Sequence, residues 1–98
     1  MRLMKLITAV VRPFKLDELR YAIAQMGVQG MTVTEVHEIE FGPRCKVEIA
    51  VDDAIAEAAL EAIANVARTG RPGDGHIMIG DLDEVIRIRT GEIGTAAT

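Results

Sequence analysis

Aromatic side chains are almost missing from this 98-residue sequence, which has no tryptophan and only Phe14, Tyr21 and Phe41. Proteins that bind single-stranded nucleic acid stack successive bases on several aromatic rings, and too few rings are available here for such a platform. The formal net charge of -4 points the same way, because nucleic-acid-binding domains usually carry a basic excess. We therefore expect no nucleic-acid partner.

Cysteine and histidine are also scarce, being limited to Cys45, His37 and His76. A single cysteine excludes an intramolecular disulfide and a cysteine-rich metal site, and neither histidine has metal-ligand spacing to a second histidine or a cysteine. There is no run of about 20 apolar residues and no apolar stretch typical of a secretion signal. We therefore expect no metal site, no membrane insertion and a cytoplasmic location.

Groups that would support catalysis are not evident either. No nucleophile, base and orienting residue form a recognisable set, and no pair of carboxylates falls in an evident cleft. We expect that the protein is not an enzyme.

Short segments of alternating apolar residues, in contrast, are plentiful. Apolar and alternating runs predict strands at residues 4–11, 31–40, 44–51 and 76–79 and a last strand at 85–89. Apolar residues at helical spacing predict helices at residues 16–26 and 54–68. The order βαββαβ is that of an α+β ferredoxin-like fold with a short extra C-terminal strand, and it places both helices on one face of an antiparallel sheet. No linker interrupts the chain, so residues 1–98 are expected to form a single domain.

The predicted strand at residues 4–11 is largely apolar on both of its faces, which is typical of a central strand that is covered on both sides. Because both helices would lie on one face, the other face should be buried against identical subunits. Burial by self-association would also supplement the limited core of a domain of this size. The sequence therefore predicts an oligomer.

Residues 69–76, Thr-Gly-Arg-Pro-Gly-Asp-Gly-His, combine three glycines with basic neighbours. Gly70, Gly73 and Gly75 permit positive φ angles and a close approach of a ligand, so that successive N–H groups could converge on phosphate oxygens. We interpret this segment, called the glycine loop below, as a phosphate cradle. The alternative interpretation, a plain turn, is the more common one for such clusters.

Arg87 and Arg89 lie two residues apart in the predicted last strand, so their side chains should project from one face about 6.6 Å apart. Ile86 and Ile88 should then point into the core. Arginine suits bidentate contact with phosphate, and the pair could complete a polyphosphate clamp with the glycine loop. A solvated edge-strand face is the alternative.

Four separate segments resemble, in the right order, the nitrogen-regulatory PII signal-transduction family. They are residues 12–17 (RPFKLD), 30–36 (GMTVTEV), 69–77 (TGRPGDGHI) and 85–92 (VIRIRTGE), and the last two are similar to the B-loop and C-loop signatures of that family. The resemblance implies a ferredoxin-like homotrimer with three intersubunit clefts that bind ATP or ADP. It also implies a regulated partner protein, which would be a transporter or a metabolic enzyme.

Carried over by position, the resemblance implies a nucleotide site without catalytic residues and without a prosthetic group, the ligand being ADP, ATP or AMP. The loop residues and the two arginines would hold the phosphates, Thr32 and the strand near Glu48 and Ala50 would face the adenine, and Arg44 stands where the family usually has a lysine close to the ligand. The full set is Thr32, Arg44, Glu48, Ala50, Gly70, Arg71, Gly73, Asp74, Gly75, His76, Arg87 and Arg89.

The sequence departs from the family in two places. Only six residues separate Val36 from Pro43, where the family normally has a long T-loop with the modified tyrosine and the residues that help bind magnesium-ATP and 2-oxoglutarate. Tyr21, in the first predicted helix, cannot replace that tyrosine. His76 stands where the family usually has lysine, and a neutral imidazole gives a weaker, pH-dependent phosphate contact.

We therefore expect a trimeric adenylate-binding sensor with a shortened T-loop and a preference shifted toward ADP or AMP. Three alternatives stay open. The chain could be a loop-deleted trimeric scaffold without signalling, a PII-like regulator of inorganic-carbon (bicarbonate) metabolism, or a weak ATPase.

Overall fold

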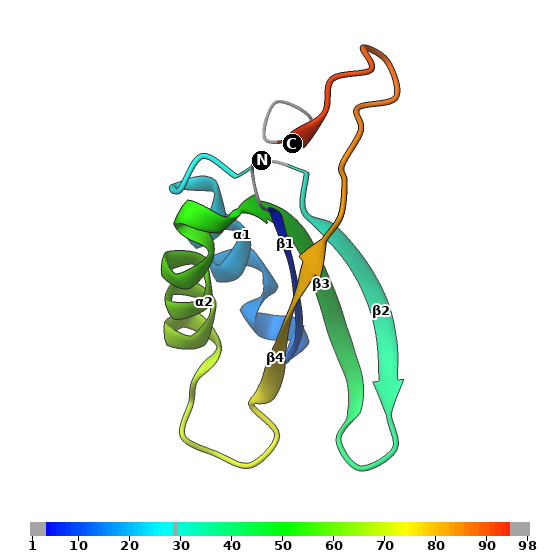
Figure 1. Cartoon of the computed structure of the whole chain (residues 1–98). Coiled ribbons are helices and arrows are strands. Elements are labelled where there is room, and N and C mark those ends of the chain that lie inside the picture. The colour runs from blue at the N-terminus through cyan, green and yellow to red at the C-terminus, as the bar shows by residue number, and fades with distance from the viewer. Residues whose placement is uncertain (1–3, 29, 95–98) are drawn as a thin grey trace.

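The computed structural model describes residues 4–28 and 30–94 of the chain (Figure 1). Its elements follow the predicted βαββαβ order, and the four strands form one antiparallel sheet in the order β2-β3-β1-β4. This confirms the ferredoxin-like fold. The elements are β1 (Met4–Val11), the 3-10 turn η1 (Pro13–Lys15), α1 (Leu16–Ala24), β2 (Thr32–Glu38), β3 (Gly42–Asp52), α2 (Asp53–Ala67) and β4 (Gly75–Leu82).

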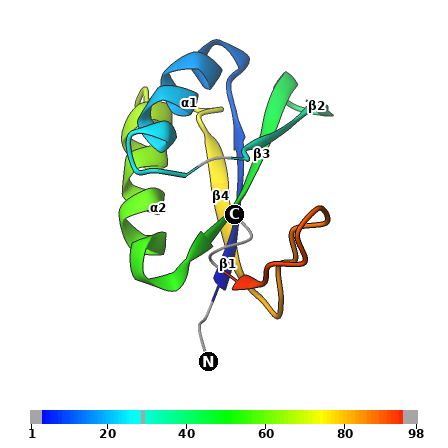
Figure 2. The same cartoon turned by 90° about the horizontal axis from the view of Figure 1, so that it is seen from above.

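Both helices pack side by side on one face of the sheet (Figure 2). The core lies between them and the two central strands, where alternate residues of β1 and β3 point toward the helices. Buried alanines such as Ala56 and Ala59 let α2 lie close to the sheet. The largest fully buried side chains are Ile7, Val11, Leu19, Ile23, Val47, Ile49, Val51 and Ile63.

Asp52 is the N-terminal cap of helix α2. The carboxylate of Asp52 accepts a hydrogen bond of 2.8 Å from the backbone N–H of Ala54, which satisfies one of the unpaired donors in the first turn. Within the described residues, no helix is both long enough and apolar enough to cross a bilayer.

The other face of the sheet is not covered by either described helix (Figure 2). Leu6, Thr8 and Val10 project from this face of β1, and Leu6 and Thr8 are partly exposed. We call this surface the open face. Its burial in a trimer stays a prediction.

The segment after β4 differs from the sequence prediction. Residues 85–89 do not form a fifth strand of the sheet, because the chain reverses at Gly91 (φ 73°) and this segment pairs with itself through a single bridge between Ile86 and Ile93. The predicted core positions are also wrong within this protomer, since the side chain of Ile86 is 55% exposed and that of Ile88 is 99% exposed. Strand β4, in turn, is longer than the expected residues 76–79.

Candidate functional site

The glycine loop connects α2 to β4 at the end of the sheet where β1 terminates, and the turn between β2 and β3 lies at the same end (Figure 1). Gly70, Gly73 and Gly75 have φ angles of 83°, 90° and 104°, so all three use the positive φ that glycine permits. Gly75 is also in close contact with β1, since a Cβ atom there would lie 1.8 Å from the carbonyl oxygen of Val10. The loop backbone therefore rests directly on the end of the central strand.

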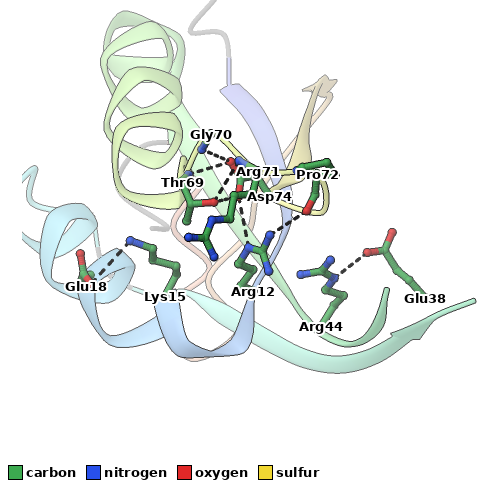
Figure 3. A network of polar contacts seen from close by, with 10 residues as sticks. All are labelled: Arg12, Lys15, Glu18, Glu38, Arg44, Thr69, Gly70, Arg71, Pro72 and Asp74. Atoms are coloured by element: carbon green, nitrogen blue, oxygen red, sulfur yellow. Dashed lines mark hydrogen bonds and ion pairs between the residues drawn. The ribbon is translucent and has the colours of Figure 1, made fainter. Parts of the chain in front are cut away.

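The side chain of Asp74 folds back onto the start of the glycine loop (Figure 3). Its carboxylate accepts hydrogen bonds from the backbone N–H groups of Thr69 at 2.7 Å and Gly70 at 2.9 Å, and from the Thr69 hydroxyl. The hydrogen bonds from Thr69, more than any other contact, hold the pKa of Asp74 well below its usual range. The carboxylate is therefore an ionised internal acceptor that shapes the loop.

This role differs from the one expected for the Asp74 side chain. The resemblance implied that Asp74 would hold phosphates by main chain and side chain, but an ionised carboxylate has no donor to offer a phosphate. In the structure its oxygen atoms are directed to Thr69, Gly70 and Arg12. The backbone of Asp74 remains part of the cradle.

Arg12 is a site residue that the sequence reasoning missed. It follows β1 directly, and its guanidinium donates from Nη2 to the carbonyl oxygen of Pro72 at 2.8 Å and from Nε to Oδ1 of Asp74 at 3.2 Å (Figure 3). A signal was available, because a βαββαβ order makes the end of the first strand an antiparallel neighbour of the start of the last. Arg12 ties the loop to β1.

Arg44, near the start of β3, touches the loop from the other side. Its side chain is only 4% exposed, and its Nε donates to Oε1 of Glu38 at 3.0 Å. The guanidinium carbon lies 5.1 Å from the centre of the Phe41 ring, a cation–π distance. A Cβ atom on Gly73 would lie 2.8 Å from both Nη2 of Arg44 and Cδ1 of Phe41. The β2–β3 turn therefore packs on the glycine loop.

A cavity of about 280 Å³ lies between this turn and the loop. Neither Glu38 nor Phe41 was predicted as a site residue, since their role depends on the contact between two loops that are distant in sequence. The lining residues are Glu38, Phe41, Arg71, Gly73, Asp74, Gly75 and His76.

The residues expected to face the adenine lie on the open face but away from this cavity. Thr32 is directly opposite Glu48 in the β2–β3 ladder, and directly opposed residues project from the same face of a sheet. Ala50 is opposite Leu6, on the same face. At about 3.3 Å per residue, Ala50 lies about 20 Å along β3 from Arg44. The structure therefore does not bring Thr32, Glu48 or Ala50 to the glycine loop of the same protomer.

The segment after β4, which contains Arg87 and Arg89, lies at the opposite end of the molecule from the loop (Figure 1). The eight-residue strand β4, about 23 Å long at roughly 3.3 Å per residue, separates them from it. Nε of Arg87 lies 3.7 Å from Oε1 of Glu92, and Arg89 is exposed in a turn. The clamp proposed from their spacing is therefore not formed within one protomer. Among the described residues, no group of three His, Cys, Asp or Glu side chains is arranged to hold a metal ion.

Comparison with known proteins gives consistent matches over nearly the whole chain. Residues 4–92 match the family model described as "Nitrogen regulatory protein P-II". The nitrogen regulatory protein P-II of Rhizobium meliloti (strain 1021) is 45% identical over 111 residues, which cover 96% of this chain and 99% of that protein. The nitrogen regulatory protein P-II 1 of Escherichia coli (strain K12) is 42% identical, with the same coverage of both chains.

Two solved structures are similar in fold. The B. subtilis GlnK–ATP complex superimposes with a TM-score of 0.89 at 30% identity, covering 98% of this chain and 96% of that one. Arabidopsis thaliana PII bound to citrate superimposes with a TM-score of 0.90 at 35% identity, covering 98% and 92%. From its sequence relatives and its fold together, the chain belongs to the nitrogen regulatory protein P-II family.

Proposed function

We propose that this P-II family protein is a homotrimeric cytoplasmic sensor that binds an adenine nucleotide between its subunits and controls a partner protein. The observation that carries the proposal is the glycine loop, whose shape is held by hydrogen bonds from Arg12 and to Asp74. The loop borders a cavity that Arg71 and His76 also line. Such a loop presents backbone donors to an anion without having to be ordered on binding. The similar fold of a GlnK–ATP complex supports a nucleotide as that anion.

The geometry of one protomer supports a site shared between subunits. The loop and its cavity lie at one end of the sheet, whereas the segment after β4, which contains Arg87 and Arg89, lies at the other. A second copy packed on the open face would bring these arginines, or the set of Thr32, Glu48 and Ala50, to the loop of its neighbour. The proposed site comprises Thr32, Arg44, Glu48, Ala50, Gly70, Arg71, Gly73, Asp74, Gly75, His76, Arg87 and Arg89, with Arg12 as the residue that positions the loop.

The β2–β3 connection supports an altered output. It consists of residues 39–41, and the alignment with the Rhizobium meliloti relative spans 111 positions, at least 13 more than this 98-residue chain can fill. We infer that the missing positions belong to the T-loop between β2 and β3. A partner would then be contacted through another surface, and binding at the cleft would change that surface by a shift in population between conformations.

Thermal melting with AMP, ADP and ATP tests the proposal. A nucleotide present at 100 times its dissociation constant should stabilise the protein by about 2.7 kcal/mol. Arg71→Gln should weaken this effect, because Arg71 lines the cavity, and the matched control Arg20→Gln, exposed on α1, should not. Light scattering during size-exclusion chromatography should give three times the 10.6 kDa chain mass.

The short β2–β3 turn also fits a trimeric scaffold that has lost signalling, and the same experiment separates the two. If no nucleotide shifts the melting temperature while the protein remains a trimer, the scaffold is the correct description. Release of inorganic phosphate from ATP in the same samples would instead indicate an ATPase.

A further inference from the structure

Arg44 is the one charged side chain that is buried among residues 4–28 and 30–94. A buried guanidinium is costly unless an anion and further contacts compensate its lost hydration. Here the carboxylate of Glu38 supplies the anion at 3.0 Å, and the ring of Phe41 covers one face of the guanidinium. Glu38 is thus the internal counter-ion of the arginine that packs against the glycine loop.

Glu38 also lines the cavity beside the loop, so its negative charge faces the space that a bound phosphate would enter. The second acid in the lining, Asp74, is held inside the loop by Thr69, Gly70 and Arg12. Glu38 is differently placed, because it lies at the end of β2, next to a turn of three residues, and is still about a third exposed. It is the acid of this cavity that a small movement of the turn would displace.

Carboxylate and phosphate compete for the same donor geometry, because the planar guanidinium binds either of them through two parallel N–H groups. Arg44 lies just behind the lining of this cavity, since a Cβ atom on Gly73, which lines it, would lie 2.8 Å from Nη2 of Arg44. A phosphate at the loop would therefore lie close to Arg44. The same phosphate would be repelled by Glu38 for as long as that carboxylate stays on Arg44. Repulsion between like charges at such short range grows with each added ligand charge.

We propose that Glu38 is an internal competitor for Arg44 and sets the charge selectivity of the phosphate site. On binding, a phosphate group takes the guanidinium from Glu38, and the displaced carboxylate loosens the turn at residues 39–41. Ligands with more phosphate charge are penalised more, so the site favours nucleotides with fewer phosphates. This inference rests on the proposed function, since it concerns the same cleft.

Glu38→Gln tests the inference, because the amide keeps a hydrogen-bond acceptor for Arg44 but removes the charge. Calorimetry in magnesium-free buffer should show ADP binding tightened on the order of tenfold, with a larger gain for ATP than for AMP. The matched control is Glu40→Gln, which removes an equal charge from an exposed position in the same turn and should change affinity by less than about twofold. In an Arg44→Gln background, Glu38→Gln no longer frees a guanidinium for the phosphate, so the part of the gain that comes from competition for Arg44 should be lost and only the relief of charge repulsion should remain.

Hydrogen exchange on the wild-type protein gives a second readout that does not depend on a variant folding. Adding ADP should protect the amides of the glycine loop and speed exchange at residues 39–41. Equal affinity gains from Glu38→Gln and Glu40→Gln, no gain from Glu38→Gln, or greater protection of the turn would overturn the inference while leaving the proposed function intact. If neither the wild type nor any variant binds a nucleotide, the proposed function fails, and this inference fails with it.

Discussion

Replacing Gly75 by alanine should cost more stability than replacing any other glycine of the loop. At φ 104° the backbone is in a region that L-residues rarely adopt, and a Cβ atom would lie 1.8 Å from the carbonyl oxygen of Val10 and 3.0 Å from its carbonyl carbon. The backbone penalty is about 1–2 kcal/mol, and forcing the strands apart adds about 1–3 kcal/mol. We expect Gly75→Ala to lower the free energy of unfolding by about 2–5 kcal/mol, a large part of a typical total.

Substitutions of the other two loop glycines distinguish the backbone penalty from the steric clash. Gly70 has a φ of 83° and nothing within 4 Å of the added atom, so Gly70→Ala should show the backbone penalty alone, about 1–2 kcal/mol. Gly73→Ala should fall between them, because the atoms in its way belong to the side chains of Arg44 and Phe41. Urea unfolding at one fixed protein concentration measures all three. If Gly75→Ala loses no more than Gly70→Ala, the close contact with β1 does not determine the loop's position.

Three further predictions concern single side chains, each measured by urea unfolding. Hydrogen bonds in the folded protein lower the pKa of Asp74. The ionised carboxylate therefore contributes fully to the free energy of unfolding above the ordinary carboxyl pKa of about 4, and this contribution is lost as the pH falls below that value toward the lower pKa of the folded state. Asp74→Asn should therefore make the free energy of unfolding depend less on pH below about pH 4. The same pH dependence in the wild type and the variant would contradict this. Asp52→Ala removes the cap of α2 and should cost about 1 kcal/mol, whereas a cost below about 0.3 kcal/mol would show that the cap contributes little. Ile63→Ala, at a buried position of α2, should cost about 2–5 kcal/mol, and a loss as small as that of a surface substitution would argue against the packing described.

The order of the elements could be predicted from the sequence because strands and helices differ in the spacing of their apolar residues. In β3, for example, Val47, Ile49 and Val51 face the helices while Lys46 and Glu48 face the opposite side. The segment after β4 has a similar alternation of isoleucine and arginine, and the same rule failed there. Alternation indicates an apolar face, but it does not identify the surface that covers that face.

The glycine loop could be found because its φ angles leave few alternatives to glycine. The contacts around it could not, since they arise where segments distant in sequence meet at one end of the sheet. Arg12 contacts the loop from the end of β1, and Glu38 reaches it through Arg44 from the end of β2. The direction of the Asp74 carboxylate was likewise hidden, because a charged residue beside glycines suggests ligand binding as readily as an internal hydrogen bond.

The last rung of the β2–β3 ladder pairs Glu38 with Gly42, and its register is maintained by buried residues farther along the strands, such as Val47. The length of the connecting segment is therefore independent of the sheet. Closing a longer flexible segment costs only about 0.6 kcal/mol for each doubling of its length. An arm of any size can thus be inserted or deleted between residues 38 and 42 while the core stays as it is. A recognition loop could therefore be engineered at this position without changing the sheet that supports it.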